Sequence, residues 1–194
     1  MSKDQEMPVR SINVTVTSRT QGKSYVKSYK HDDGKVYEVP LYVVSVRGTD
    51  DQGQPVSREF RAIRFAVKRD SLSDAASTVG LAESQQYVVP QWLPDYVLHS
   101  TQTAEVGAWQ VSGNYLIHDG PDDPLDATNL YGGYGCIEIA DGPLGFDKFN
   151  DFILSISGAT NTTRKEKLLA VGASGKLRIV YEEAARPPVK LKQL

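Results

Sequence analysis

The 194-residue sequence predicts a mostly β protein, a β-rich α+β fold built on a mixed β-sheet or sandwich. Most of the chain consists of short runs in which apolar and polar residues alternate. These runs are rich in Val, Ile and Thr, which is typical of half-buried strands. Only two segments, both after Cys136, repeat their apolar residues at helical spacing. We therefore expect many strands and one or two helices, with most of the chain in one domain.

The first 70 residues are expected to form a small N-terminal β-meander, either as part of the same domain or as an appendage to it. Strands are predicted at residues 11–17, 35–46 and 59–68. The second of these is a strand pair or one long strand interrupted at Pro40. Polar segments that contain Gly, at residues 31–34 and 49–53, are typical of turns that join hairpins.

Residues 69–85 are polar and rich in Ser and Ala, so we expect a linker or a short irregular crossing. The β pattern returns at residue 86, and strands are predicted within residues 86–93, 95–101 and 107–118. Gly113–Asn114 is expected to form the turn inside the last of these segments.

The two expected helices follow Cys136. Within residues 146–157 five apolar residues repeat at helical spacing: Phe146, Phe149, Phe152, Ile153 and Ile156. Gly158 is a fitting end. Thr163 and Glu166 have the spacing of a capping box, and Gly172 is expected to end the helix that follows. A last strand is predicted at residues 176–181, and residues 182–194 are expected to be a disordered or loosely docked tail.

Composition excludes several classes of protein. The net charge of −2, with both signs mixed along the chain, lacks the basic footprint of a nucleic-acid-binding protein. No apolar run approaches the roughly 20 residues that span a bilayer. The N-terminal residues lack the apolar core of a secretory signal peptide, so we expect synthesis in a cytosol without Sec export. One cysteine can form neither an internal disulfide nor a structural zinc site.

Cys136 and His118 are the candidate catalytic residues. A lone cysteine is often a small buried hydrophobe, and this alternative stays open. Gly135 precedes Cys136, with more Gly nearby, and so allows a sharp turn that directs backbone N–H groups to one point. His118 ends an apolar run 18 positions upstream (136 − 118), where it could take the thiol proton or simply bind a loop carbonyl.

The segments IHDGP (residues 117–121) and GYGCIEI (residues 133–139) resemble the catalytic region of the L,D-transpeptidase (YkuD-like) family. That family has a His at a strand end, a loop, and then Ser/Thr-His-Gly-Cys leading into a strand. The resemblance covers residues 86–156, and it implies a YkuD-like catalytic domain at residues 86–181. It also implies that Cys136 is the nucleophile, His118 the general base and Gly135 the motif glycine, with no cofactor and no metal.

Three positions depart from the family's pattern. Gly133 stands where the family has Ser or Thr, Tyr134 stands where it has the motif His, and Glu138 replaces an Arg or Asn. These family residues help to place the acyl-donor peptide, so hydrolysis is at least as probable an outcome as cross-linking. Tyr134 is either a substitute hydrogen-bond donor or a turn residue that faces solvent.

Three further residues are candidates for substrate binding. Asp119 follows the candidate base directly, and His99 ends a strand pattern much like the one that ends at His118. Trp109 is a core or a groove-lining aromatic. The acidic residues of the loop after His118 lack the spacing of a Ca²⁺-binding loop, so solvated carboxylates are expected there.

The resemblance implies a cysteine acyl-transfer enzyme whose substrate is a peptidoglycan stem peptide. Wall chemistry without a secretory signal implies a specialised delivery route, as for an interbacterial effector of type VI secretion or a phage lysis protein. An effector would have a cognate immunity protein as its partner. Two alternatives stay open: a non-catalytic β-rich binding or structural module with an inert Cys136, and a cysteine peptidase with protein substrates.

Overall fold

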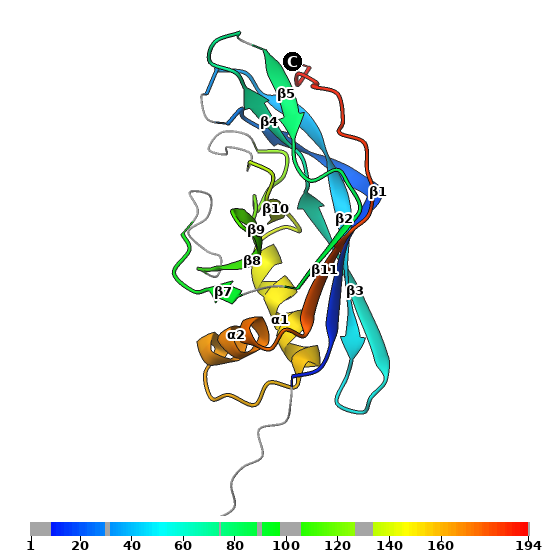
Figure 1. Cartoon of the computed structure of the whole chain (residues 1–194). Helices are drawn as coiled ribbons and strands as arrows, with labels where there is room; N and C mark the ends of the chain where they lie inside the picture. Colours follow the sequence, from blue (N-terminus) through cyan, green and yellow to red (C-terminus); the bar gives the residue numbers. More distant parts are fainter. Residues whose placement is uncertain are drawn as a thin grey trace, which may run out of the picture.

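A large mixed β-sheet forms the body of the protein (Figure 1). The computed structural model describes residues 9–29, 32–73, 75–88, 91–97, 106–126 and 134–193. In this part of the chain nine strands form one sheet in the order β6-β11-β1-β2-β3-β10-β9-β8-β7. Their bounds are β1 Ile12–Val26, β2 Tyr37–Thr49, β3 Pro55–Ile63, β6 Gln85–Val88, β7 Gln91–Leu93, β8 Ala108–Ser112, β9 Tyr115–Asp119, β10 Ile137–Ile139 and β11 Leu177–Tyr181.

The other elements are a small second sheet and two helices. Strands β4 (Ala66–Arg69) and β5 (Ala76–Val79) pair with each other, and the helices are α1 (Gly145–Ser157) and α2 (Arg164–Ala173). Both helices lie on the same side of the long strands β1 to β3 (Figure 1). The prediction of a mostly β, α+β fold with helices after Cys136 is confirmed.

The predicted N-terminal meander is present as β1, β2 and β3, which are antiparallel neighbours. These three strands lie in the middle of the large sheet, between β11 on one side and β10 on the other. Both flanking strands come from the C-terminal half of the chain, and β11 runs parallel to β1. The N-terminal region therefore shares one sheet with the strands around Cys136.

Two strand predictions change around the middle of the meander. Strand β2 continues through Pro40 as one strand, because β3 pairs with β2 only from Leu41 onward and Pro40 lies beyond the end of β3. The strand predicted at residues 59–68 divides into β3 and β4 at Arg64. The guanidinium of Arg64 is fully buried and donates to the carbonyls of Thr17, Leu81 and Glu182.

The predicted linker at residues 69–85 is wrong over its central part, which forms β5. This strand is held by backbone pairing with β4, and its side chains are at most partly buried, so no apolar alternation marks it. The strand predicted at residues 95–101 is not found in its described part, residues 95–97, which lie in a loop after β7. The turn at Gly113–Asn114 is confirmed between β8 and β9.

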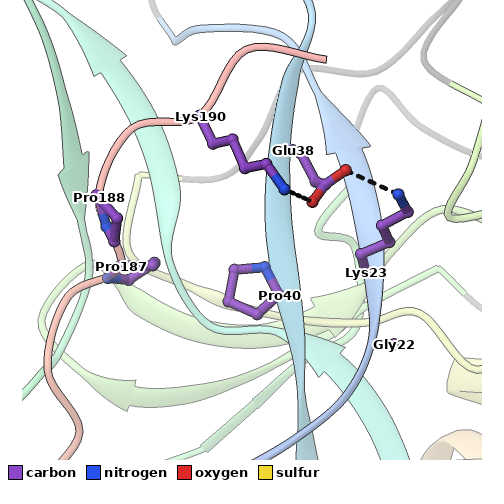
Figure 2. A pocket seen from close by; sticks show the side chains of 7 residues that line it. All are labelled: Gly22, Lys23, Glu38, Pro40, Pro187, Pro188 and Lys190. Atoms are coloured by element: carbon purple, nitrogen blue, oxygen red, sulfur yellow. Dashed lines mark hydrogen bonds and ion pairs between the residues drawn. The ribbon is translucent and has the colours of Figure 1, made fainter. Parts of the chain in front are cut away.

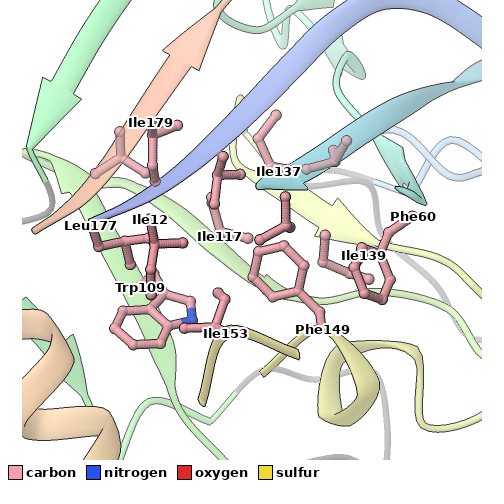
Figure 3. Close-up of a cluster of buried hydrophobic side chains, with 14 of the residues drawn as sticks. Ile12, Phe60, Trp109, Ile117, Ile137, Ile139, Phe149, Ile153, Leu177 and Ile179 are labelled. Carbon is pink, nitrogen blue, oxygen red and sulfur yellow. The ribbon is translucent and has the colours of Figure 1, made fainter. Parts of the chain in front are cut away.

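Helix α1 covers the core face of the sheet (Figure 3). Phe146, Phe149, Ile153 and Ile156 are all buried, as their spacing predicts. The helix ends at Gly158, which adopts a left-handed conformation with φ of 70° that glycine accommodates easily. The side chains opposite α1 come from strands that are far apart in sequence, including Ile12, Ile117 and Ile179.

Helix α2 begins as predicted, with a complete capping box between Thr163 and Glu166. It does not end at Gly172, because this glycine lies within the helix and faces β7. A Cβ atom at position 172 would lie 2.5 Å from the backbone nitrogen of Trp92. Gly172 therefore allows close packing of helix and strand instead of ending the helix.

The C-terminal tail is docked, so of the two expected states, disordered or loosely docked, the disordered one is wrong. The backbone N–H of Glu38 donates to Lys190, and that of Lys192 donates to Val36. The Glu38 carboxylate also binds Lys23 and Lys190 at 2.8 and 2.6 Å (Figure 2). At this end of β2, β1 pairs with one edge but β3 does not reach the other, and the tail supplies backbone partners there.

Candidate active site

A pocket of about 710 Å³ contains the two residues that the sequence analysis selected as catalytic candidates. Its lining includes Cys136 and His118, together with four tyrosines: Tyr29, Tyr96, Tyr115 and Tyr134. The tyrosines come from the end of β1, the loop after β7, the start of β9 and the turn before β10. The pocket therefore combines residues from both halves of the chain.

Two neighbouring parallel strands place Cys136 and His118 on one face of the sheet. Strand β10 pairs with β9 so that Glu138 lies opposite His118. Ile117, Ile137 and Ile139 point into the core beneath α1. Because side chains alternate along a strand, His118 and Cys136 must both point to the opposite face.

Gly135 gives the backbone its direction just before β10. Its φ of 101° lies in a region that residues with a Cβ atom rarely adopt. A Cβ atom at this position would also lie 2.9 Å from Cε1 of Tyr115 and 3.4 Å from Cα of Gly80. Gly135 is therefore needed for both the turn and the contact with Tyr115. Gly133, the other motif position before Tyr134, lies outside the described residues.

His118 is held in one orientation by its own strand. Its side chain is 2% exposed, and Nδ1 lies 2.6 Å from the carbonyl oxygen of Asp119. A carbonyl only accepts hydrogen bonds, so Nδ1 carries the proton and Nε2 is left as the basic nitrogen. The ring of Tyr96 lies beside the imidazole, with 6.2 Å between ring centroids.

Asp119 serves the site through its backbone, in contrast to the predicted role in substrate binding. Its side chain is buried and is not part of the pocket lining. Asp119 pairs with Ile139 as the last residues of β9 and β10, and side-chain alternation directs it to the face opposite to that of His118. Its carbonyl orients His118 instead.

Cys136 is partly buried and carries a neutral thiol at neutral pH. Burial raises the pKa of the thiol to about 11, and the charge of Glu138 adds to this rise, whereas a hydrogen bond from the backbone of Leu116 opposes it. The Sγ atom lies 3.7 Å from the carbonyl oxygen of Asn114, to which the thiol donates. The thiolate is the reactive form, so chemistry at Cys136 requires a base that takes this proton.

Tyr134 lies at the mouth of the pocket and is 48% exposed. Its ring packs against that of Tyr29 at 5.5 Å, and Nζ of Lys68 lies 5.4 Å from the ring centre. A hydrogen bond with the Tyr134 hydroxyl raises the pKa of Lys68. Tyr134 is therefore tied to the N-terminal region of the chain and is not simply a turn residue in solvent.

Sequence reasoning missed Tyr29, Lys68 and Tyr96 as parts of the site. Tyr29 pairs with Lys68 of β4 in an isolated parallel bridge, which carries both residues to Tyr134. The contact between Tyr29 and Tyr134 joins segments about 100 residues apart, so no local sequence pattern predicts it.

Trp109 is a core residue, and its prediction as a substrate-binding residue is wrong. The side chain is fully buried, and its Nε1 donates to Oδ1 of Asn150 at 2.8 Å. The ring packs on Trp92, with 4.7 Å between centroids. Trp109 belongs to the buried cluster that includes Ile117 and Ile153 (Figure 3). His99, the third predicted substrate-binding residue, lies outside the described residues.

A second pocket, of about 530 Å³, lies where the C-terminal tail crosses β1 and β2 (Figure 2). Pro40, Pro187 and Pro188 line it beside the ion pairs of Glu38. It holds neither a nucleophile nor a histidine, so the pocket at Cys136 is the better candidate for chemistry. Across the described residues, no three His, Cys, Asp or Glu side chains form a group that could hold a metal ion, and no helix is long and apolar enough to cross a membrane.

No protein-family model, curated protein or solved structure matches this chain. What the protein does is therefore inferred from the chemistry of the pocket. The pocket contains the neutral thiol of Cys136, the imidazole of His118 with one nitrogen bonded to a carbonyl, and four tyrosine side chains.

Proposed function

We propose that this protein is a cysteine acyl-transfer enzyme that acts on peptidoglycan stem peptides, as an L,D-transpeptidase or as an L,D-carboxypeptidase or endopeptidase. The observation that carries the proposal is that Cys136 and His118 line one pocket from adjacent parallel strands. The substrate class comes from the resemblance of residues 117–121 and 133–139 to the L,D-transpeptidase family. A metal or an organic cofactor has no part in this chemistry.

His118 takes the thiol proton in the first step. The S–H bond of Cys136 breaks, a new N–H bond forms at Nε2, and the thiolate attacks a peptide carbonyl. The carbonyl π electrons move to oxygen, where backbone N–H groups at Gly135 and Cys136 stabilise the oxyanion. The C–N bond then breaks, the leaving amine takes the proton from His118, and a thioester on Cys136 remains.

Water or an amine completes the reaction by attack on the thioester. His118 removes a proton from the attacking group and returns it to the sulfur as the C–S bond breaks. Hydrolysis is at least as well supported as cross-linking, because Tyr134 and Glu138 stand in place of groups that position the peptide in the family. Delivery by a type VI secretion system or a phage, and an immunity protein as partner of an effector, belong to the same proposal.

A second candidate function is a non-catalytic binding or structural module. The raised pKa of Cys136 favours it, because a neutral and partly buried thiol is unreactive without a base. In this case the tyrosine-lined pocket holds a ligand and the cysteine is a small apolar contact.

The test is incubation of the protein with purified peptidoglycan, followed by mass analysis of the released and cross-linked muropeptides. We expect the wild type to change the muropeptide profile and Cys136→Ala and His118→Ala to leave it unchanged. Ser155→Ala, on the exposed face of α1, is the matched control and should act as the wild type. A wild-type profile identical to that of Cys136→Ala would remove the proposal and leave the binding module.

A further inference from the structure

Glu138 is a buried carboxylate next to the pocket lining, and the steps above do not use it. It is 6% exposed and lies in β10, two residues after Cys136. A buried ionised carboxylate requires compensation by charges or hydrogen bonds nearby. Its position in the sheet shows which group it can influence.

The register of the sheet puts Glu138 next to His118. The two residues are direct partners in the parallel ladder of β9 and β10, and paired strands lie about 4.8 Å apart. Direct partners point to the same face of a sheet, and so do residues two apart on one strand. Glu138, His118 and Cys136 therefore share one face, with the carboxylate beside the imidazole.

Among the described residues, two elements flank this pair: β3 and the loop after β7. Strand β3 presents the apolar Ile63 as the partner of Glu138, and Arg61 on that strand pairs with Asp141. The loop after β7 presents Tyr96, whose pKa is raised by burial and by the charges of Cys136, Tyr29 and Glu138. Lys68 of β4 binds Tyr134 at the pocket.

We propose that Glu138 is a positioning residue that stabilises the protonated imidazole of His118 while the Cys136 thiolate forms. The inference rests on the proposed function of the pocket, and it assigns a role to a position where the sequence departs from the family's pattern. Nδ1 of His118 is already bonded to the carbonyl of Asp119 and Nε2 must accept the thiol proton. The carboxylate therefore acts through its charge, not as the hydrogen-bond acceptor of a catalytic triad.

Glu138 has two opposing electrostatic effects, and their balance can be measured. Its negative charge disfavours the thiolate of Cys136, and it favours the imidazolium of His118. We expect the second effect to be the larger one, because His118 is the direct strand partner of Glu138, whereas Cys136 lies two residues away along the chain. Removal of the charge should therefore reduce the population of the thiolate–imidazolium pair.

The test is the rate of alkylation of Cys136 by iodoacetamide as a function of pH, in the folded protein with no peptidoglycan present. A thiol that shares its proton with an imidazole shows a plateau of reactivity at neutral pH, before the rate rises with ionisation of the thiol itself. We expect Glu138→Gln to lower this plateau about tenfold, the effect of roughly one pKa unit at His118. Near pH 11 the rate should rise instead, because removal of the Glu138 charge favours ionisation of the thiol itself. In the background of His118→Ala, Glu138→Gln should cause no further decrease.

The opposite sign overturns the inference. If Glu138 acted mainly on the sulfur, Glu138→Gln would speed alkylation at neutral pH, and if its role were only structural, the plateau would stay unchanged. If Glu138→Gln does not fold, the imidazole pKa of His118 in the wild type is measured by NMR, with His118→Ala used to assign its signal. A value above the ordinary value of about 6.5 supports the role of Glu138, and a value at or below it overturns that role.

These outcomes do not depend on the substrate. A plateau that falls in Glu138→Gln, in a protein that leaves peptidoglycan unchanged, would support the coupling of Glu138 to His118 and remove the wall substrate. An unchanged plateau, in a protein that does alter muropeptides, would support the wall substrate and remove the coupling of Glu138 to His118. The two hypotheses therefore fail separately.

Discussion

Gly135→Ala tests whether the turn before β10 is required for both the fold and the pocket. At φ of 101°, the alanine occupies a conformation that costs about 1–2 kcal/mol. Its Cβ atom would also lie 2.9 Å from the ring of Tyr115, and relief of such overpacking costs at least about 1 kcal/mol. The sum predicts that the free energy of unfolding falls by about 2–3 kcal/mol.

Gly142→Ala is the matched control for this change. Gly142 has a φ of 82°, but a Cβ atom there meets no atom within 4 Å. This variant should lose only the conformational cost of about 1–2 kcal/mol. The difference between the two variants isolates the contact with Tyr115.

Urea unfolding followed by tryptophan fluorescence measures both variants. With a slope of about 1–3 kcal/mol/M, the midpoint of Gly135→Ala should fall by about 1 M or more, and further than that of Gly142→Ala. The muropeptide assay should then show lost activity in Gly135→Ala alone. Equal midpoints for the two variants would refute the crowding at Tyr115, and equal activities would refute a role of Gly135 in the geometry of the pocket.

Two further predictions concern packing and pH. Gly172→Ala should lower the thermal unfolding temperature, because the new Cβ would lie 2.5 Å from the backbone of Trp92. This clash should outweigh the helix propensity of Ala, which is about 0.8–1 kcal/mol better than that of Gly. A variant as stable as the wild type would contradict this packing. The pKa of Cys136 is raised from 9.0 to about 11, so the folded state binds the thiol proton more tightly than the unfolded state. This stabilisation is complete below pH 9 and is lost as the pH rises to about 11. The free energy of unfolding, measured in urea, should therefore fall less between about pH 8 and about pH 10.5 in Cys136→Ala than in the wild type. Equal losses in the two proteins would mean that the thiol is not the group that titrates.

Elements with a strong local pattern were predictable. The apolar residues of α1 repeat at helical spacing because one face of the helix packs on the sheet, and the capping box of α2 is a contact between neighbours in sequence. The meander of β1 to β3 follows from alternation and from short turns. Elements without such a pattern were missed: β5 has little buried surface, and the tail is held by backbone bonds to β2.

The residues of the candidate site also fall into a predictable and an unpredictable group. Cys136, His118 and Gly135 stand out because a rare nucleophile, a base and a flexible residue are recognisable as residue types. Trp109 was misjudged because an aromatic residue beside a candidate site looks the same whether its strand faces the pocket or the core. The face depends on strand register, and a shift by one residue exchanges the two faces.

The amino-acid sequence by itself determined the β-rich class, the two helices and the identity of the candidate nucleophile and base, because these depend on periodicity and on side-chain chemistry. Only the tertiary structure decided that β9 and β10 lie side by side in parallel, with Glu138 against His118. It also decided that Tyr29 and Lys68 reach Tyr134 from the other half of the chain. Such pairings depend on which strands, distant in sequence, bury apolar surface against each other. The residues of one strand alone do not specify its partner.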